Sequence, residues 1–455
     1  MCFAFHRASA SRGRDFGLLN QQRTTDNEQR TPYWALRFDQ IALGFLIVLV
    51  VSLPVASITS VRDISIGFVF LCWLIKAILT RHWRPRTTRL EAAWIIYGAF
   101  IVLSLFTAVD LGYSLNQFRG EYVKNFLLFL LVIQFVTTKK RAKAILLGIA
   151  AGNLVMISVG IAEFISQGGS LITRPEASQE FGSGWASLHS GGGTYSTYLI
   201  TVFPFLLWLV VEWRKWWAQA LAIILVVANV FSLYITFQRG AWVAFVMMVA
   251  AAIFLIPRKN WIRGLCLAVF LIAVGGGLCL APTQTLVHEE KNLHSLSQVI
   301  REPERSIGKR ITTWRVSLGY IVDNPLKGAG FGRRSPYKKY DYYKRKESDL
   351  YWHAHNTFLN LGLELGLPGL LAFIFLLARL SWLGWHTYRR SPPGDLTHYL
   401  AIALLLMIVA VVFRNMFDHF FIDDTAMLFW FLAAVVVGVT ERQRLSSTTD
   451  SIPPS

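Results

Sequence analysis

Apolar runs recur along most of the chain, from residue 40 to residue 438, and most of them are about 18–22 residues long. A helix needs roughly 20 apolar residues to cross a bilayer, because no water inside the membrane can bind its backbone groups. The pattern therefore predicts an all-α, polytopic integral membrane protein with about twelve transmembrane helices. The expected ranges are 40–58, 63–80, 90–108, 123–137, 144–166, 194–213, 216–236, 240–256, 262–281, 356–379, 398–417 and 424–439.

The distribution of basic residues between the apolar runs predicts the orientation. Alternate short loops are rich in lysine and arginine, as in Lys139-Lys140-Arg141, and such loops stay on the cytoplasmic side. Both termini are then expected inside. The expected parts are a basic cytoplasmic tail at 1–38, helices one to nine within 39–281, a large periplasmic loop at 282–355, helices ten to twelve within 356–440, and a second cytoplasmic tail at 441–455.

Composition supports the same class of protein. The hydrophobic share of the 455 residues is 54%, and 45 lysines and arginines against 27 acidic residues give a net charge of +18. In a soluble protein this charge would point to nucleic acid, but here it follows the loops, so we expect membrane lipids and no nucleic acid as partners. The loop at 282–355 holds 14 of these cations, which suits a phosphate-rich substrate on the outer face.

The large loop has internal order of its own. Apolar residues at helical spacing predict an amphipathic helix from Ser306 to about Asp323, and Asn324-Pro325 ends it. Three glycines between residues 328 and 332 predict a flexible turn, and a run rich in lysine and tyrosine follows at 337–346.

Two histidines stand where this loop meets the tenth helix. In His353-Ala354-His355-Asn356, the asparagine is a natural helix cap, which places His355 just outside the first turn. An imidazole can accept a proton at neutral pH, so His355 is the candidate base and His353 a possible substrate contact. The alternative is that both histidines are polar residues that only mark the helix start.

Arginines expected at the outer face are candidates for holding phosphate. Arg239-Gly240 is expected at the outer end of the helix at 216–236, in a tight turn between two apolar runs, and Arg310 precedes Trp314 by one turn of the amphipathic helix. A guanidinium grips phosphate with two hydrogen bonds, although an arginine at a helix end can also simply extend to the interface. Arg174 and Arg119 are weaker candidates. The outer loops lack clustered carboxylates at metal-ligand spacing, so we expect no metal and no cofactor.

Four short motifs resemble those of the O-antigen ligase and polymerase superfamily. They are His355-Asn356-x-Phe358-Leu359 with Glu364-x-Gly366-x-x-Gly369; Arg239-Gly240; Arg310-x-x-x-Trp314 with Asn324-Pro325-Leu326-x-Gly328-x-Gly330; and Gly193-Thr194-Tyr195 leading into Tyr198-Leu199. The resemblance covers roughly residues 120–440, and it is the order of all four motifs on this topology that makes it specific.

The resemblance implies an O-antigen ligase of the membrane-embedded, GT-C-like glycosyltransferase type in the bacterial inner membrane. Such enzymes take a glycan from undecaprenyl pyrophosphate at the periplasmic face and join it to a sugar hydroxyl of lipid A core, with inversion and without a metal. By the resemblance, His355 is the catalytic histidine, and Arg239 and Arg310 hold the pyrophosphate. The chain departs from the pattern in its second histidine, His353.

Two alternatives remain. A polymerase, or a ligase that glycosylates protein, would share the outer-face chemistry and differ only in its acceptor. A transporter of lipid-linked glycan without catalysis would instead place polar groups near the membrane midplane, between broken helices. The candidate residues lie at the expected outer surface, which favours an enzyme.

Overall fold

The structure is a computed structural model of the whole chain. It describes residues 33–268, except 56, 57, 82, 84, 85, 87, 167–191, 257 and 258, together with residues 306–344 and 353–449. Helices make up almost all of this part and it contains no strand, so the predicted all-α class is confirmed.

The helices fall into three groups along the chain. The first comprises α2 (Tyr33–Ser52), α3 (Thr59–Thr80), α4 (Glu91–Leu105), α5 (Leu111–Gln117), the π-helical turn η2 (Phe118–Val123), α6 (Lys124–Phe135) and α7 (Lys139–Ser166). The second comprises α8 (Gly192–Glu212), α9 (Trp216–Ile235) and α10 (Arg239–Leu255). The third comprises α14 (Ser306–Asp323), α15 (Ser335–Lys339), the 3₁₀ turn η4 (Asp341–Lys344), α16 (Thr357–Arg390), α17 (Leu396–Met416) and α18 (Asp423–Thr449).

Eight helices in the described part are long and apolar enough to cross a membrane, and they lie within α2, α3, α7, α8, α9, α16, α17 and α18. Two shorter apolar helices, α4 and α10, match two more of the predicted spans. These helices identify a multi-pass membrane protein. The total of twelve, the sidedness and the domain boundaries stay predictions, and of the helix expected at 262–281 only the part up to residue 268 is described.

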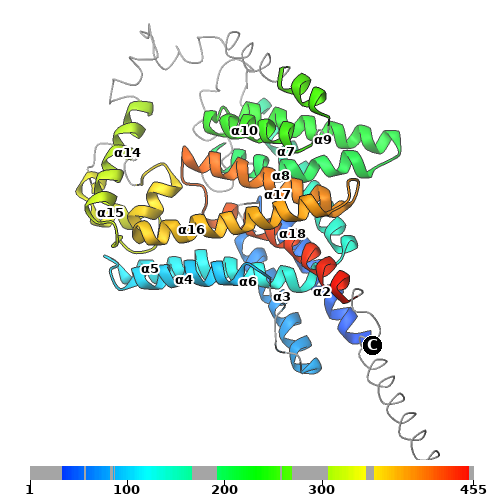
Figure 1. Cartoon of the computed structure of the whole chain (residues 1–455), viewed down its shortest axis with the longest axis horizontal. Helices are drawn as coiled ribbons and strands as arrows, with labels where there is room; N and C mark the ends of the chain where they lie inside the picture. Colours follow the sequence, from blue (N-terminus) through cyan, green and yellow to red (C-terminus); the bar gives the residue numbers. More distant parts are fainter. Residues whose placement is uncertain are drawn as a thin grey trace, which may run out of the picture.

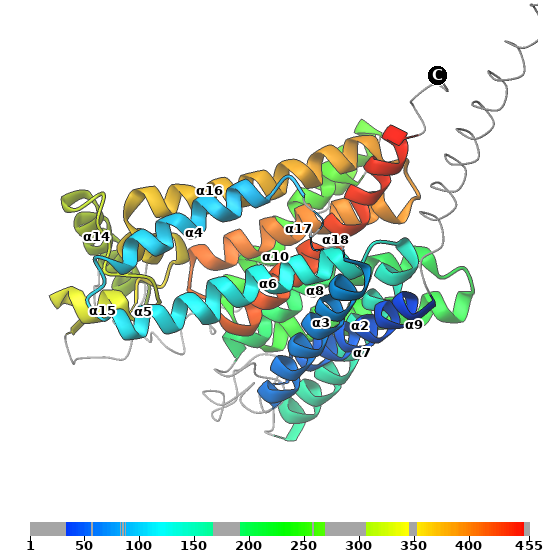
Figure 2. The ribbon, with the colours of Figure 1, turned by 90° about the horizontal axis from the view of Figure 1, so that it is seen from below.

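The long helices form a bundle, and the elements of the outer loop gather at one end of it. Figures 1 and 2 show α14 and α15 beside the beginning of α16, far from the end where α18 finishes. The amphipathic helix predicted from Ser306 to about Asp323 is observed as α14. Within the predicted loop, the described residues 306–344 therefore form an ordered layer over one end of the bundle.

Burial differs sharply among the apolar helices. Nearly every side chain of α18 from Ala426 to Val437 is buried, because α18 packs against α6, α8 and α17. In contrast, α9 exposes Leu221, Ile224 and Val227. A helix that is apolar on all sides is stable only when protein or lipid surrounds it. We infer that α18 is the centre of the bundle and that α9 lies at its lipid-facing edge.

A break near the start of α16 connects the glycine turn to the bundle. Gly366 has φ 74° and ψ 177°, a conformation that favours glycine, and it interrupts the helix. The turn after α14 fills this break: Leu367 N–H donates to the Pro325 carbonyl at 2.7 Å, and Ala329 N–H to the Leu363 carbonyl at 2.8 Å. The prediction that this turn is flexible is therefore wrong, because backbone hydrogen bonds hold it against α16.

Candidate active site

The start of α16 fixes the two histidines. The Asn356 side chain caps the helix by accepting from the N–H groups of Phe358 and Leu359, at 2.9 and 3.1 Å. Just before it, His355 takes φ 47°, which is unusual for a residue with a side chain. Its N–H donates to Nδ1 of His353 at 2.9 Å, and this bond stabilises the strained turn. Such strain persists only where surrounding contacts hold it.

The side chain of His355 meets an acid that the sequence did not single out. Its Nδ1 lies 3.3 Å from Oδ1 of Asp418, in the turn between α17 and α18, and that oxygen also accepts from the N–H of His419 at 2.8 Å. Burial raises the pKa of Asp418, but the hydrogen bond with His355 and the charges of both histidines and Arg414 hold the pKa well below its usual range. An ionised Asp418 accepts a hydrogen bond from Nδ1–H of His355 and orients the ring, which leaves the lone pair on Nε2.

His353 has a different environment. Its side chain is only 1% exposed, and its Nε2 lies 2.9 Å from a guanidinium nitrogen of Arg333. Burial, and then the charges of His355 and Arg333, lower the pKa of His353 well below its usual value, so this ring is neutral. A neutral imidazole has one acceptor nitrogen, and the N–H of His355 already points at Nδ1. His353 is therefore poorly placed to take a proton from a substrate.

Arg310 reaches the same turn from α14. Its Nη1 donates to the Phe417 carbonyl at 2.8 Å, directly before Asp418. Its Nε has no hydrogen-bond partner among the described residues. Trp314, one turn further along α14, is half-buried, and its indole N–H likewise lacks a partner in the described part. The structure thus brings Arg310 to the histidine pair, with donors left for an anion.

Arg239 lies beside this turn as well. It is the exposed first residue of α10, and a Cβ on the neighbouring Gly240 would lie 3.2 Å from Cβ of Phe417 and 2.9 Å from Nη1 of Arg414. Only a glycine lets the first turn of α10 approach the end of α17 so closely. The Arg-Gly pair therefore brings the start of α10, which carries Arg239, next to Phe417, whose carbonyl accepts from Arg310.

After Asp418, Arg414 is the second residue of the site whose role the sequence did not reveal. It is buried on α17, where its Nε donates to the Thr197 hydroxyl at 3.2 Å and its Nη2 to the Gly193 carbonyl at 3.4 Å. These contacts join the end of α17 to the start of α8. They explain the Gly193-Thr194-Tyr195 motif as a packing element. An arginine close to the end of an apolar helix was the available signal, since such a charge is costly without partners.

Arg333 is the third, and the glycine turn positions it. The buried carboxylate of Glu364 accepts from the Gly332 N–H at 2.7 Å and from the Asn360 side chain. Asn360 also accepts from the N–H of Ala354 at 3.1 Å, so one network connects the turn with the segment of the histidines. A cavity of about 40 Å³ adjoins this network. It is large enough for a water molecule and too small for a sugar.

The remaining predicted residues lie apart from this cluster or outside the described part. Arg119 is exposed in η2, and its side chain donates to Asn116 of the same helical run at 3.4 Å. Arg174 lies outside the described residues. The basic aromatic run is less open than expected, because Tyr340 and Tyr343 are buried and Tyr340 stacks on Tyr320 at 4.4 Å between ring centroids.

The cluster has one arrangement that resembles a metal site. Ligand atoms of His353, His355 and Asp418 lie within 4.8 Å of one another. However, both nitrogens of His353 already face N–H donors, from Arg333 and from the backbone of His355. A divalent cation needs lone pairs directed at it, and the guanidinium would repel it. The geometry suits a base and an anion better than a cation.

The comparisons with known proteins concern the family that this chain resembles. The family model described as O-antigen ligase matches residues 224–374, which include Arg239, Arg310 and both histidines. A Rickettsia typhi protein provisionally named a polysaccharide ligase is 27% identical over 160 residues. The resemblance to the O-antigen ligase superfamily is confirmed. The aligned part covers 34% of this chain and 38% of that relative, and the family match ends before Arg414 and Asp418.

Proposed function

We propose that this superfamily member is an O-antigen ligase, an inverting and metal-independent glycosyltransferase of the bacterial inner membrane. It transfers O-antigen glycan from undecaprenyl pyrophosphate to a sugar hydroxyl of lipid A core at the periplasmic face. The observation that carries the proposal is the His355–Asp418 pair, with the arginine-bearing segments beside it, at one end of a membrane bundle. An oriented base next to anion-binding groups is what such a displacement requires.

His355 takes the acceptor proton in this proposal. Nε2 removes the proton from the hydroxyl while the oxygen forms a bond to the anomeric carbon of the donor. The bond between that carbon and the pyrophosphate oxygen breaks, and undecaprenyl pyrophosphate leaves with the electron pair. Asp418 balances the positive charge that His355 gains. The choice of His355 over His353 follows from two features of His353: burial lowers the pKa of its ring, which makes it a weak base, and N–H donors face both of its nitrogens.

Arg239 and Arg310 bind the leaving group. Arg310 donates to the Phe417 carbonyl, directly before Asp418, and Gly240, the neighbour of Arg239, packs close to Phe417. The Arg310 Nε is without a partner in the described part. A guanidinium makes two parallel hydrogen bonds to phosphate and needs no metal to neutralise it. Arg333 is a further candidate, because a substrate phosphate would offer it a better acceptor than the crowded nitrogen of His353.

The broken helix α16 bears on the transporter alternative. Transporters place broken helices at the membrane midplane, around the substrate. Here the turn after α14 fills the break at Gly366, because Leu367 and Ala329 share backbone hydrogen bonds with Pro325 and Leu363. The break therefore holds the chain's own backbone rather than a substrate, which favours an enzyme.

An acceptor assay tests the proposal and decides between ligase and polymerase. Membranes that contain the protein receive labelled lipid-linked glycan together with either lipid A core or additional lipid-linked glycan. We expect label on lipid A core with the native protein and none with His355→Ala. Label on longer lipid-linked glycan would identify a polymerase, and transfer to protein alone would identify a protein O-oligosaccharyltransferase. Movement of donor across the membrane with no transfer would overturn the enzymatic proposal.

A further inference from the structure

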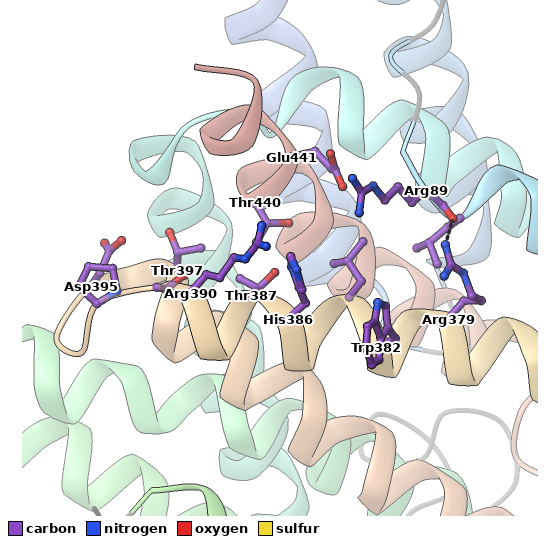
Figure 3. Close-up of a pocket in the computed structure, with 14 residues that line it drawn as sticks. Arg89, Arg379, Trp382, His386, Thr387, Arg390, Asp395, Thr397, Thr440 and Glu441 are labelled. Carbon is purple, nitrogen blue, oxygen red and sulfur yellow. Dashed lines mark hydrogen bonds between the residues drawn. The ribbon is translucent and has the colours of Figure 1, made fainter. Parts of the chain in front are cut away.

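A second polar site lies at the end of the bundle opposite the histidines. It is a pocket of about 510 Å³ between the last turns of α16, the segment before α4, the α16–α17 loop and the end of α18. Figure 3 shows Arg89, Arg379, His386 and Arg390 around it. The stretch of α16 from Thr357 to Arg379 separates this basic pocket from the histidines, roughly 33 Å along the helix.

The part of α16 that lines the basic pocket is a single helix face. Arg379, Trp382, His386 and Arg390 follow one another at steps of three and four residues, which places them in one row along the helix. The preceding stretch of α16, from Leu370 to Leu377, is entirely apolar. A polar row on a membrane helix is costly unless it meets water or a charged partner. The row therefore marks a binding surface rather than a lipid-facing one.

The basic pocket carries a surplus of positive charge. Three arginines line it, and of its two acids Asp395 is paired with Lys139, which lies outside the lining, at 2.6 Å. In Figure 3 the side chain of Arg89 extends toward the other acid, Glu441. Arg379 donates to the Arg89 carbonyl at 3.2 Å. Among the described residues no carboxylate forms a salt bridge with Arg379 or Arg390, so these two guanidinium groups remain available to an anion.

We propose that the basic pocket binds the phosphate-bearing headgroup of an anionic phospholipid. Its volume suits a small ligand rather than a macromolecule. It lies where membrane-capable helices end, and Trp382 at its edge is 58% exposed, as is usual for tryptophan at a membrane interface. Arginines on either side of the hollow can grip the phosphate, while Trp382 and Leu383 offer apolar surface to the start of the acyl chains.

Basic loops attract anionic lipid in general, and this attraction requires no pocket. A matched pair of variants distinguishes such diffuse attraction from binding in the basic pocket. Arg389 and Arg390 are neighbours at the exposed end of α16, but only Arg390 lines the pocket. Arg389 lies over the Trp385 ring instead. Changing either one to glutamine removes the same charge from the same helix end, and neither change disturbs a buried contact.

The test is lipid retention by the full-length protein. Purified protein is delipidated in detergent and incubated with dioleoylphosphatidylglycerol or dioleoylphosphatidylcholine, and the bound lipid is counted by native mass spectrometry. We expect selective retention of phosphatidylglycerol. Arg390→Gln should weaken this retention about fivefold, Arg379→Gln/Arg390→Gln more strongly, and Arg389→Gln hardly at all. Inorganic phosphate at millimolar concentration should not displace the lipid.

Three results would overturn the proposal. Equal loss in Arg389→Gln and Arg390→Gln would show diffuse attraction without a site. Equal retention of the two lipids would show that the headgroup charge does not determine binding. Displacement by inorganic phosphate alone would show a site for a soluble anion rather than for a lipid. None of these outcomes depends on transfer activity, so the inference stands or fails independently of the proposed function.

Discussion

Nδ1 of His355 lies 3.3 Å from Oδ1 of Asp418, although 63 residues separate the two in the sequence. The contact forms because the cap of α16 and the turn after α17 meet: the Asn356 side chain donates to the Met416 carbonyl at 3.1 Å, and Thr357 donates to Asn415 at 2.7 Å. A carboxylate on one ring nitrogen leaves the other as the basic one. The pair therefore behaves as one unit in the proposed reaction.

The first prediction concerns this pair. We expect His355→Ala to lower the single-turnover transfer rate by roughly 10²–10⁴-fold with donor affinity nearly unchanged, because a general base acts mainly in the transition state. Asp418→Asn should also lower the single-turnover transfer rate, but by a smaller factor, because the amide keeps the shape of the side chain and loses its charge. Donor binding and single-turnover transfer are measured separately for each variant.

Asp323→Asn is the matched control, because Asp323 is an exposed acid at the end of α14, away from the pair. His353→Ala should be the milder of the two histidine changes. Abolished transfer in His353→Ala with normal transfer in His355→Ala would show that the base is two residues earlier. Loss of donor binding in His355→Ala would contradict its role as a base altogether.

The sequence predicted the helices well but only part of the site. Periodicity gave α14 closely, and the cap rule gave the start of α16 at Asn356, because both signals are local. Asp418 and Arg333 carried no local signal. Their roles arise only when the turn after α17 and the glycine turn fold against the start of α16, and a single sequence does not record such long-range contacts. The prediction that the glycine turn is flexible was wrong for the same reason.

The second prediction concerns the arginines that face the donor. Arg310→Ala and Arg239→Ala should weaken donor binding as well as rate, because phosphate is charged in both the ground state and the transition state. The expected loss in affinity is roughly 10- to 100-fold for each. Arg→Lys should rescue only part of it, since an ammonium keeps the charge and loses the two-pronged geometry. Arg315→Ala, an exposed arginine on the same α14, should bind donor normally. Equal effects of Arg315→Ala and Arg310→Ala on donor binding would show that Arg310 acts only through general surface charge.

The third prediction tests the glycine turn. A Cβ on Gly328 would overlap the carbonyl of Glu364, and backbone on both sides leaves no room for adjustment. Gly328→Ala should therefore lower the free energy of unfolding by about 1–3 kcal/mol and reduce transfer by displacing Arg333. Gly319→Ala is the control, because nothing lies within 4 Å of its added Cβ and alanine favours a helix. Thermal denaturation in one detergent compares the two, and equal midpoints would show that the turn is not packed against α16 as described.

The fourth prediction concerns acid. Burial lowers the pKa of His353 and His419 well below the usual value, so the folded protein keeps both rings neutral where the unfolded chain would protonate them. At these two positions the unfolded state then binds more protons, so their contribution to stability falls as the pH drops below about 6.5. We expect this contribution to lower the thermal midpoint from pH 7 to pH 5, and His419→Asn to reduce its size. The slope with pH is the readout, since a purely structural loss would lower the midpoint equally at both values. An unchanged slope would show that His419 does not contribute.

The last prediction is that transfer survives removal of divalent cations. The grouping of His353, His355 and Asp418 is the one place in the described part where three potential ligands converge. A metal there would take the lone pair of His355 and leave no base, while the adjacent guanidinium of Arg333 would oppose its charge. Arginines can hold the pyrophosphate without it.

The assay compares transfer in untreated membranes, in EDTA, and in EDTA followed by excess Mg²⁺, Mn²⁺ or Zn²⁺. We expect equal rates in the first two and no gain in the third. Loss of transfer in EDTA that only Mg²⁺ or Mn²⁺ restores would point to a metal on the pyrophosphate. Restoration by Zn²⁺, if abolished in His353→Ala, would instead identify the histidine cluster as a metal site, and His355 would then act as a ligand rather than a base.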